Sequence, residues 1–126
     1  MSVPVELSAV RDRIAEYGSV AYLVTVGDEG RAHVVSVEVR VEGDRLVVPL
    51  GRTSRRNLEA NPALTLLWPP RPDPAYSMLV DATAASFSDD PAEATVEPHS
   101  AVLHRVAGAA GDGPTCLPLA DPVADA

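Results

Sequence analysis

The sequence predicts a mainly β protein of the α+β class, in which six antiparallel strands form a small barrel accompanied by two short helices. Two observations predict this fold. Segments rich in β-branched residues recur along the chain with turn signals between them, and hydrophobic residues make up 46% of the 126 residues. Because closing a sheet removes its unpaired edges, such a series of strands favours a barrel.

The first helix is predicted over residues 6–17. Its apolar side chains recur at helical spacing along one face, and its charged side chains occupy the other. The apolar residues are Leu7, Val10, Ile14 and Tyr17. Gly18 is expected to end this helix, because glycine is favoured just beyond a helix C-terminus.

Three strands of an antiparallel meander follow, at residues 19–26, 31–41 and 45–50, with turns at 27–30 and 42–44. The second of these strands alternates strictly, so one face is expected to be buried and the other to be polar. The apolar face consists of Val35, Val37, Val39 and Val41, and the polar face of Ser36, Glu38 and Arg40.

The second helix is predicted over residues 55–60, and Asn61-Pro62 ends it because proline disfavours a helical residue before it. The remaining strands are predicted at residues 63–68, 76–87 and 94–106. Pro98 marks a bulge or a sheet edge within the last of them.

Residues 1–106 form one predicted domain, and residues 107–126 form a tail in which twelve of twenty residues are Ala, Gly or Pro. We expect this tail to be poorly ordered. It contains the single cysteine, Cys116, which excludes an intrachain disulfide and is interpreted as an incidental thiol.

The charge of the chain excludes several functions. The formal net charge is −8, and all ten basic residues are arginine. An acidic chain repels phosphate backbones, so nucleic-acid binding is not expected. Without lysine, the chain can form neither a Schiff base with pyridoxal phosphate nor a P-loop. No apolar run is long enough to span a bilayer and no signal-peptide pattern is present, so we expect a cytoplasmic protein without a membrane partner.

Three of the ten arginines fall within the five residues 52–56, where the second helix begins. Free backbone N–H groups at a helix N-terminus favour an anion, and the hydroxyls of Thr53 and Ser54 add hydrogen-bond donors. This pattern predicts a phosphate or carboxylate site. An equally weighted alternative is that Ser54 caps the helix while the arginines pair with acidic neighbours such as Glu59.

The other polar residues give weaker signals. The histidines, His33, His99 and His104, are scattered and are interpreted as structural or surface residues, without a metal site. No G-x-S-x-G motif is present, so a hydrolase triad has no support. The aromatic residues Tyr22, Trp68 and Tyr76 are interpreted as core or interface residues rather than as neighbours of a planar cofactor.

The run Ser54–Trp68, with its Asn-Leu and Asn-Pro pairs, resembles the S-R-K…N-P segment of the pyridoxamine 5′-phosphate oxidase-like split-barrel flavoproteins. The runs Gly30–Val37 and Leu46–Val48 are similar to the second and third strands of that family. The resemblance covers residues 6–106.

The resemblance implies a six-stranded split β-barrel that forms a homodimer and binds FMN at the dimer interface. Some relatives bind the deazaflavin coenzyme (F-420) instead, and a few bind haem. It also implies that the start of the second helix holds the cofactor phosphate, while the second strand and the end of the third lie beside the ring system. The implied cofactor-binding residues are Val35, Ser36, Val37, Leu50, Arg52, Thr53, Ser54, Arg55 and Arg56.

The leading hypothesis is therefore an FMN- or deazaflavin-dependent oxidoreductase that acts on a small molecule, with no catalytic residue named. One alternative is a non-catalytic cofactor-binding protein. The absence of lysine favours it, as do Ser36 and Glu38, where many relatives carry proline and an aromatic residue. Another alternative is a haem-binding barrel that uses one of the three histidines.

Overall fold

The computed structural model of the chain describes residues 7–72, 75–105 and 116–118. Two helices and eight strands lie within this part of the chain. In chain order they are α1 (Leu7–Tyr17), β1 (Val20–Val26), β2 (Ala32–Glu38), β3 (Arg40–Glu42), β4 (Arg45–Pro49), α2 (Arg52–Ala60), β5 (Ala63–Trp68), β6 (Ser77–Asp89), β7 (Ala92–His104) and β8 (Cys116–Pro118). The predicted mainly β architecture with two helices is confirmed.

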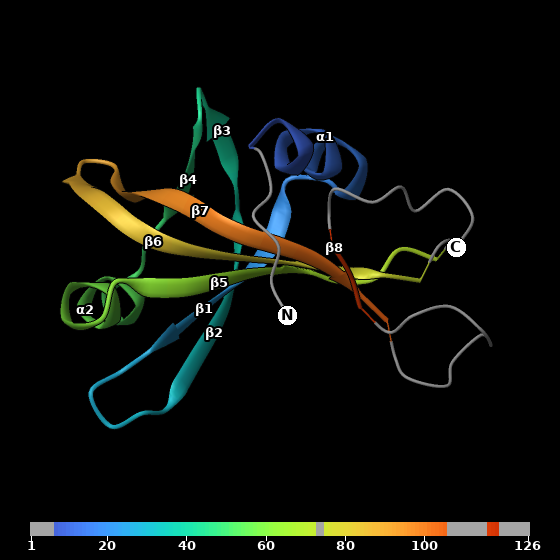
Figure 1. Cartoon of the computed structure of the whole chain (residues 1–126). Helices are drawn as coiled ribbons and strands as arrows, with labels where there is room; N and C mark the ends of the chain where they lie inside the picture. The colour runs from blue at the N-terminus through green and yellow to red at the C-terminus, as the bar shows by residue number, and fades with distance from the viewer. Residues whose placement is uncertain (1–6, 73–74, 106–115, 119–126) are drawn as a thin grey trace.

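All the described strands belong to one curled antiparallel sheet with the order β2-β1-β5-β6-β7-β4-β3, and β8 pairs with β7 (Figure 1). The strands β2 and β3 lie at opposite ends of this order, although only Val39 separates them in the sequence. One extended segment therefore pairs with β1 at its beginning and with β4 at its end, which curls the sheet.

The prediction of a single strand over residues 31–41 is wrong at Val39. The backbone N–H of Val39 leaves the ladder and donates a hydrogen bond of 2.7 Å to the carbonyl of Ser19. The predicted alternation holds across this break, since Val37 and Val39 are buried and Val35 and Val41 pack against the core. The break divides one predicted strand into two, which with β8 accounts for eight strands instead of six.

The strand β8 also lies inside the segment that was predicted to be a poorly ordered tail. Its backbone pairs with β7 from Val102 to His104, and the Ala/Gly/Pro-rich composition around it gave no strand signal. The rest of the predicted tail, at residues 107–115 and 119–126, lies outside the described residues.

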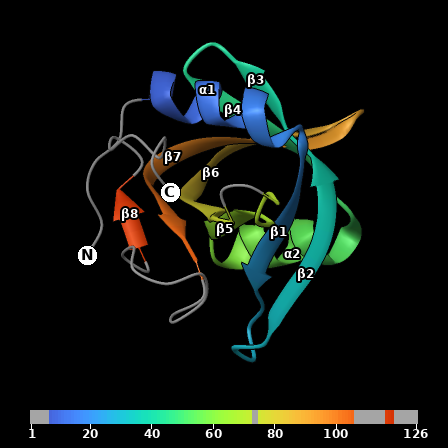
Figure 2. The same cartoon turned by 90° about the vertical axis from the view of Figure 1, so that its right-hand side faces the viewer.

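The helix α1 covers one side of the curled sheet, and α2 lies on the opposite side (Figures 1 and 2). Val10 and Ile14 of α1 are buried in the core and Tyr17 packs against it, as the helical spacing predicts. Gly18 ends the helix with a positive φ of 96°, a conformation that favours glycine, and its carbonyl accepts a 2.9 Å hydrogen bond from Trp68 Nε1. None of the described helices is long and apolar enough to cross a membrane.

The pairing of β6 with β7 shifts register twice. His99 is the extra residue at the first shift, where Asp81 pairs with Ser100 and Ala82 with Pro98. The predicted irregularity at Pro98 therefore lies beside a bulge in the pairing with β6. On its other side β7 pairs with β4 up to Val96 and with β8 from Val102, so no described strand pairs with Pro98 there. Bulges of this kind increase local twist, which suits a strongly curled sheet.

The outer face of the β1–β2 hairpin carries apolar side chains that are exposed. Val20, Tyr22 and Val34 are 59%, 42% and 54% exposed. In contrast, Trp68 and Tyr76 are buried in the core. The expectation of core or interface positions therefore holds for these two residues, and Tyr22 lies on an open sheet face.

Candidate functional site

The helix α2 begins directly after β4 with an uncapped N-terminus. Gly51 is its N-cap residue, in an extended conformation, and no side chain caps the helix. The helix therefore begins at Arg52, three residues before the predicted start, and the interpretation of Ser54 as the cap is wrong. A capping side chain would accept hydrogen bonds from the first backbone N–H groups of the helix. Because no side chain caps α2, these N–H groups are free to donate to an anion.

Two adjoining hollows lie beside this N-terminus. The hairpin hollow, of about 410 Å³, lies between the β1–β2 turn and α2, and its lining residues are Gly27, Asp28, Glu29, Arg31, Ala32, His33, Thr53, Arg56 and Asn57. The strand hollow, of about 490 Å³, lies between β2 and the β4–α2 junction, and its lining residues are His33, Val35, Ser36, Val37, Pro49, Leu50, Gly51, Arg52, Thr53 and Ser54. His33 and Thr53 line both, so we call the pair the double hollow.

Strand register explains why His33 faces α2. His33 of β2 is the direct partner of Thr25 of β1, and directly paired residues of antiparallel strands project to the same face. Thr25 is buried, and its hydroxyl oxygen accepts a 3.1 Å hydrogen bond from Asn57 Nδ2 of α2. This buried hydrogen bond fixes the hairpin against the helix and sets the spacing between the two walls of the hairpin hollow.

Most of the arginines have acidic or carbonyl partners, but within the described part of the chain those around the double hollow have none. Arg13, Arg40, Arg45, Arg55 and Arg71 form ion pairs, and Arg11 donates to the carbonyl of Gly43. Arg31, Arg52 and Arg56 form no ion pair with any described residue. All three line the double hollow. Three guanidinium groups without carboxylate partners around one space are typical of a site for an anionic ligand.

Unlike the arginines that line the double hollow, Arg55 is surrounded by acidic and aromatic partners. It pairs with Asp89 at 3.0 Å and with Glu59 at 3.6 Å, and its guanidinium lies over the Phe87 ring, 4.6 Å from the centroid. It lines neither hollow. For Arg55, the alternative in which the cluster pairs with acidic neighbours such as Glu59 is confirmed, and for Arg52 and Arg56 it is wrong.

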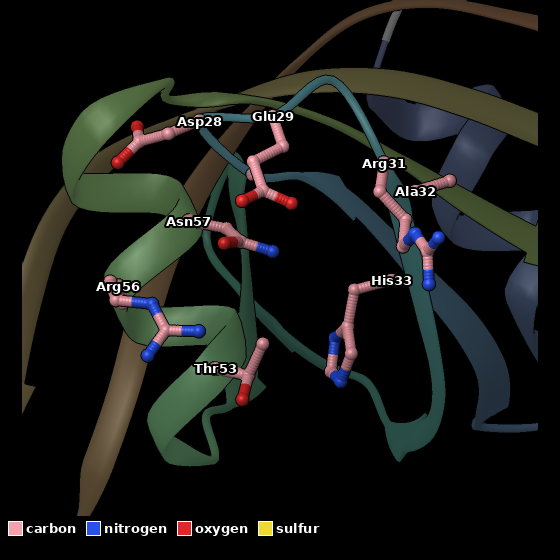
Figure 3. A pocket seen from close by; sticks show the side chains of 9 residues that line it. Asp28, Glu29, Arg31, Ala32, His33, Thr53, Arg56 and Asn57 are labelled. Carbon is pink, nitrogen blue, oxygen red and sulfur yellow. The ribbon is translucent and has the colours of Figure 1, made fainter.

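The hairpin hollow also has an acidic edge. Figure 3 shows Arg56 and Thr53 extending from α2, His33 from the facing strand, and the carboxylates of Asp28 and Glu29 at the turn above them. Neither carboxylate forms an ion pair with a described residue. The hollow therefore presents cations on two walls and carboxylates at its rim.

Glu38 does not share the double hollow. It is exposed on the outer face of β2, accepts a 3.4 Å hydrogen bond from the Ser19 hydroxyl, and lines a separate hollow beside Arg40. Glu38 is therefore not among the residues that line the strand hollow.

The structure gathers most of the predicted cofactor-binding residues in one place. The strand hollow is lined by Val35, Ser36, Val37, Leu50, Arg52, Thr53 and Ser54, and the hairpin hollow by Arg56 together with Thr53. Arg55 is the predicted residue that the structure leaves outside. The role of each residue in holding a cofactor stays a prediction.

Sequence reasoning missed other lining residues. His33 was interpreted as structural, and Asp28 and Glu29 as parts of a turn. Asn57 was quoted only for the resemblance. The available signal was geometric: a hairpin with its turn at residues 27–30 places His33 opposite Thr25, on the face that α2 covers. The other two histidines lie elsewhere, since His99 contacts Thr83 and His104 is exposed on β7. No three His, Cys, Asp or Glu side chains of the described residues are arranged to hold a metal ion.

A curled antiparallel sheet with a short helix that begins beside its second strand defines a class of small split-barrel proteins. The chain matches the pyridoxamine 5′-phosphate oxidase family over residues 8–117 and belongs to this family. Uncharacterised proteins of Mycobacterium bovis and Mycobacterium tuberculosis are each 41% identical to it over an alignment of 109 residues, covering 75% of this chain and 75% of each relative.

Solved structures share the fold at low sequence identity. An F420 reductase has a TM-score of 0.57 at 19% identity, covering 65% of this chain and 87% of its own. A Clostridium acetobutylicum protein related to general stress protein 26 has a TM-score of 0.58 at 11% identity, and the match covers 80% of this chain and 90% of that protein. The haem storage protein HutZ of Vibrio cholerae has a TM-score of 0.54 at 15% identity, and the match covers 76% of this chain and 91% of HutZ.

Proposed function

We propose that the double hollow binds FMN or the related deazaflavin coenzyme, and that the chain is an oxidoreductase acting on a small molecule. The observation that carries this proposal is the set of guanidinium groups, from Arg31, Arg52 and Arg56, that line the double hollow without a carboxylate partner among the described residues. In an acidic chain, the positive charge of these guanidinium groups is most simply neutralised by the phosphate of a ligand.

The shape and chemistry of the two hollows support a flavin-type ligand. Ligand sites typically enclose about 300–1,000 Å³, and each hollow falls within this range. The strand hollow offers the apolar side chains of Val35, Val37 and Leu50, which suit a planar ring. The uncapped N-terminus of α2 and the hydroxyls of Thr53 and Ser54 suit a phosphate.

In this proposal, the side chains bind and orient the cofactor rather than react. A bound flavin or deazaflavin supplies hydride transfer, which no protein side chain supplies. The arginines neutralise the phosphate and the apolar wall of β2 excludes water from one side of the ring. The relatives named as an F420 reductase and as a protein of the pyridoxinephosphate oxidase family agree with this reaction class.

We also propose that the chain acts as a homodimer through the outer face of β1 and β2. The side chains of Val20, Tyr22 and Val34 are exposed there, and an open apolar face of this kind favours association. A Tyr22→Glu variant should shift a dimer toward monomer in light scattering. A wild-type monomer at all concentrations would contradict the dimer.

The direct experiment is a titration of the purified protein with FMN and, separately, with the deazaflavin coenzyme, followed by fluorescence quenching and absorbance. Saturable binding of either is expected, and turnover of the reduced cofactor with an electron acceptor would establish catalysis. Absence of binding of both would overturn the proposal.

The second candidate is a cofactor-binding protein without catalytic activity, including a haem-binding one. The observation that favours the haem-binding form is that the double hollow is lined by one histidine, His33. Saturable flavin binding without turnover would support the non-catalytic protein. A Soret band after addition of haemin that disappears in a His33→Ala variant would support haem.

A further inference from the structure

The acidic rim of the hairpin hollow consists of Asp28 and Glu29, which lie in the turn between β1 and β2. Figure 3 shows both residues at the turn, with Asn57 below them and Thr53 at the far side of the space. Arg31 and Arg56 line the same hollow, yet neither carboxylate forms an ion pair with a described residue. The negative charge of both groups therefore acts on whatever enters the hollow.

The turn that carries the two carboxylates is held against α2. The Gly30 N–H donates a 2.9 Å hydrogen bond to the Gly27 carbonyl, and the Gly27 N–H donates one of 3.2 Å to the Arg31 carbonyl. Gly27 also packs so closely on α2 that a β-carbon there would lie 3.0 Å from Oδ1 of Asn57. Together with the buried hydrogen bond from Asn57 to Thr25, these contacts fix the acidic rim relative to the helix.

The helix separates the acidic rim from the proposed phosphate position. Thr53 lies in the first turn of α2 and Asn57 four residues later, which is about 6 Å further along the helix axis. This separation is shorter than the Debye length at physiological salt, so charges at the two ends interact. A ligand that ends in a phosphate at the helix N-terminus stops short of the rim. A ligand with further negative groups in the hairpin hollow approaches two carboxylates.

A separate observation indicates that a ligand group enters this hollow. Nδ1 of His33, which lines the hollow, is buried and has no hydrogen-bond partner among the described residues. An unpaired buried polar atom costs free energy, and such an atom beside a hollow is typical of a space that a polar group fills. The charges around the hollow therefore bear on which ligand binds.

We propose that Asp28 and Glu29 are specificity-determining residues, which admit a ligand with one terminal phosphate and disfavour a ligand whose phosphate is followed by further negative charge. The double hollow then prefers FMN to a flavin that carries a second phosphate beyond the first. Selection by repulsion of the wrong ligand requires no contact with the right one. This inference rests on the proposed function, because it narrows the class of ligand for the same site.

The test compares FMN with riboflavin 5′-diphosphate, which differs from FMN by one added phosphate group. Flavin fluorescence at low salt gives the dissociation constants for the wild type and for an Asp28→Asn, Glu29→Gln double variant. This rim variant keeps the shape of both side chains and removes their charge. We expect the wild type to prefer FMN, and the ratio of the two constants to fall about tenfold in the rim variant. Added salt should weaken the preference of the wild type, because both carboxylates are exposed.

A matched control separates the rim from the overall charge of the chain. A Glu42→Gln, Asp44→Asn double variant makes the same change of charge where β3 turns into β4, and these residues line neither hollow. Its ratio of constants should equal that of the wild type. Thermal melting by circular dichroism shows whether each variant is folded.

Three results would overturn the inference while FMN binding, and with it the proposed function, stands. They are a wild type that binds the diphosphate as tightly as FMN, a ratio that the rim variant leaves unchanged, and an equal change in the control variant. If no flavin binds, the proposed function fails, and calorimetric titration with orthophosphate and pyrophosphate tests the rim alone. A larger gain in affinity for pyrophosphate than for orthophosphate in the rim variant supports the inference. Equal gains, or no binding of either anion, would contradict it.

Discussion

Arg40 and Arg56 are both exposed arginines of an acidic chain, but their surroundings differ. Arg40 links β3 to β7, since its guanidinium donates to Glu42 at 2.6 Å and to Glu93 at 2.9 Å. Arg56 stands on α2 beside the hairpin hollow and pairs with no described carboxylate. The chain has eighteen acidic residues for ten arginines, so a partner is easily supplied.

The difference separates an arginine that joins two strands from arginines that form no ion pair with a described residue. The guanidinium of Arg40 is held by Glu42 of its own strand and by Glu93 of β7, whereas the three guanidinium groups around the double hollow form no ion pair with a described residue. An unsatisfied group of cations costs little while water solvates it, and its charge remains available for binding. Substitutions in the two regions should therefore have different consequences.

The largest expected effect is on cofactor binding. An Arg52→Ala, Arg56→Ala double variant should bind FMN about a hundredfold or more weakly, because two charge-assisted hydrogen bonds are each worth about 1.5–3 kcal/mol. Fluorescence titration gives the dissociation constant. Arg40→Ala is the matched control and should bind FMN as the wild type does. Equal losses in both variants would mean that binding depends on overall charge and not on the site.

The next effect concerns stability. Asn57→Ala removes the buried hydrogen bond to Thr25 and should lower the free energy of unfolding by about 1–3 kcal/mol. Its neighbour in the sequence, Arg56, is exposed and forms no ion pair with a described residue, so Arg56→Ala should change that free energy by no more than about 0.5 kcal/mol. Urea denaturation of both variants measures the contrast. Similar stabilities for the two would show that the Asn57 hydrogen bond contributes nothing.

A smaller effect is expected at the acidic rim of the hairpin hollow. Glu29→Gln removes a negative charge near the proposed phosphate position and should raise the affinity for FMN about threefold at low salt. The gain should decrease as salt is added, because the rim is exposed. Glu42→Gln, at the Arg40 cluster, should leave the affinity unchanged. A gain that does not respond to salt would point to a change of shape instead of charge.

The smallest effect is a pH dependence at the Arg40 cluster. The hydrogen bond from Arg40 holds the pKa of the Glu93 carboxyl below its ordinary value of 4.5. A lowered pKa in the folded state stabilises the fold above the ordinary value, and the contribution is lost as pH falls through the lowered one. Urea midpoints of wild type and Glu93→Gln should therefore differ at pH 6 and converge in acid. A difference that persists at pH 2 would contradict this origin.

The local elements were predictable because short-range signals specify them. The helical spacing of Val10 and Ile14 and the stop at Gly18 are both present in the structure, and β5 spans the predicted residues 63–68. It was harder to predict which strands pair with one another. The second strand divides at Val39, whose N–H donates a hydrogen bond to the carbonyl of Ser19, twenty residues earlier, and no local pattern encodes this contact.

The candidate site was predictable only in part. The arginine cluster and the resemblance brought Arg52, Thr53, Ser54 and Arg56 together with residues of β2, and the structure places them around the double hollow. Sequence reasoning could not separate Arg55 from Arg56. They are neighbours in the chain, but successive residues of a helix point about 100° apart, so one reaches Asp89 and the other the hollow.

By itself the sequence determined the β-rich composition, the surplus of acid over base, the alternation of the second strand and the start of a helix among arginines. These follow from spacing within a few residues, which helical and extended backbones convert directly into faces. The tertiary structure decided which arginines form no ion pair with a described residue, and it placed His33 and Thr53 around the same two hollows. Such facts depend on contacts between segments twenty or more residues apart, and only the curled sheet brings those segments together.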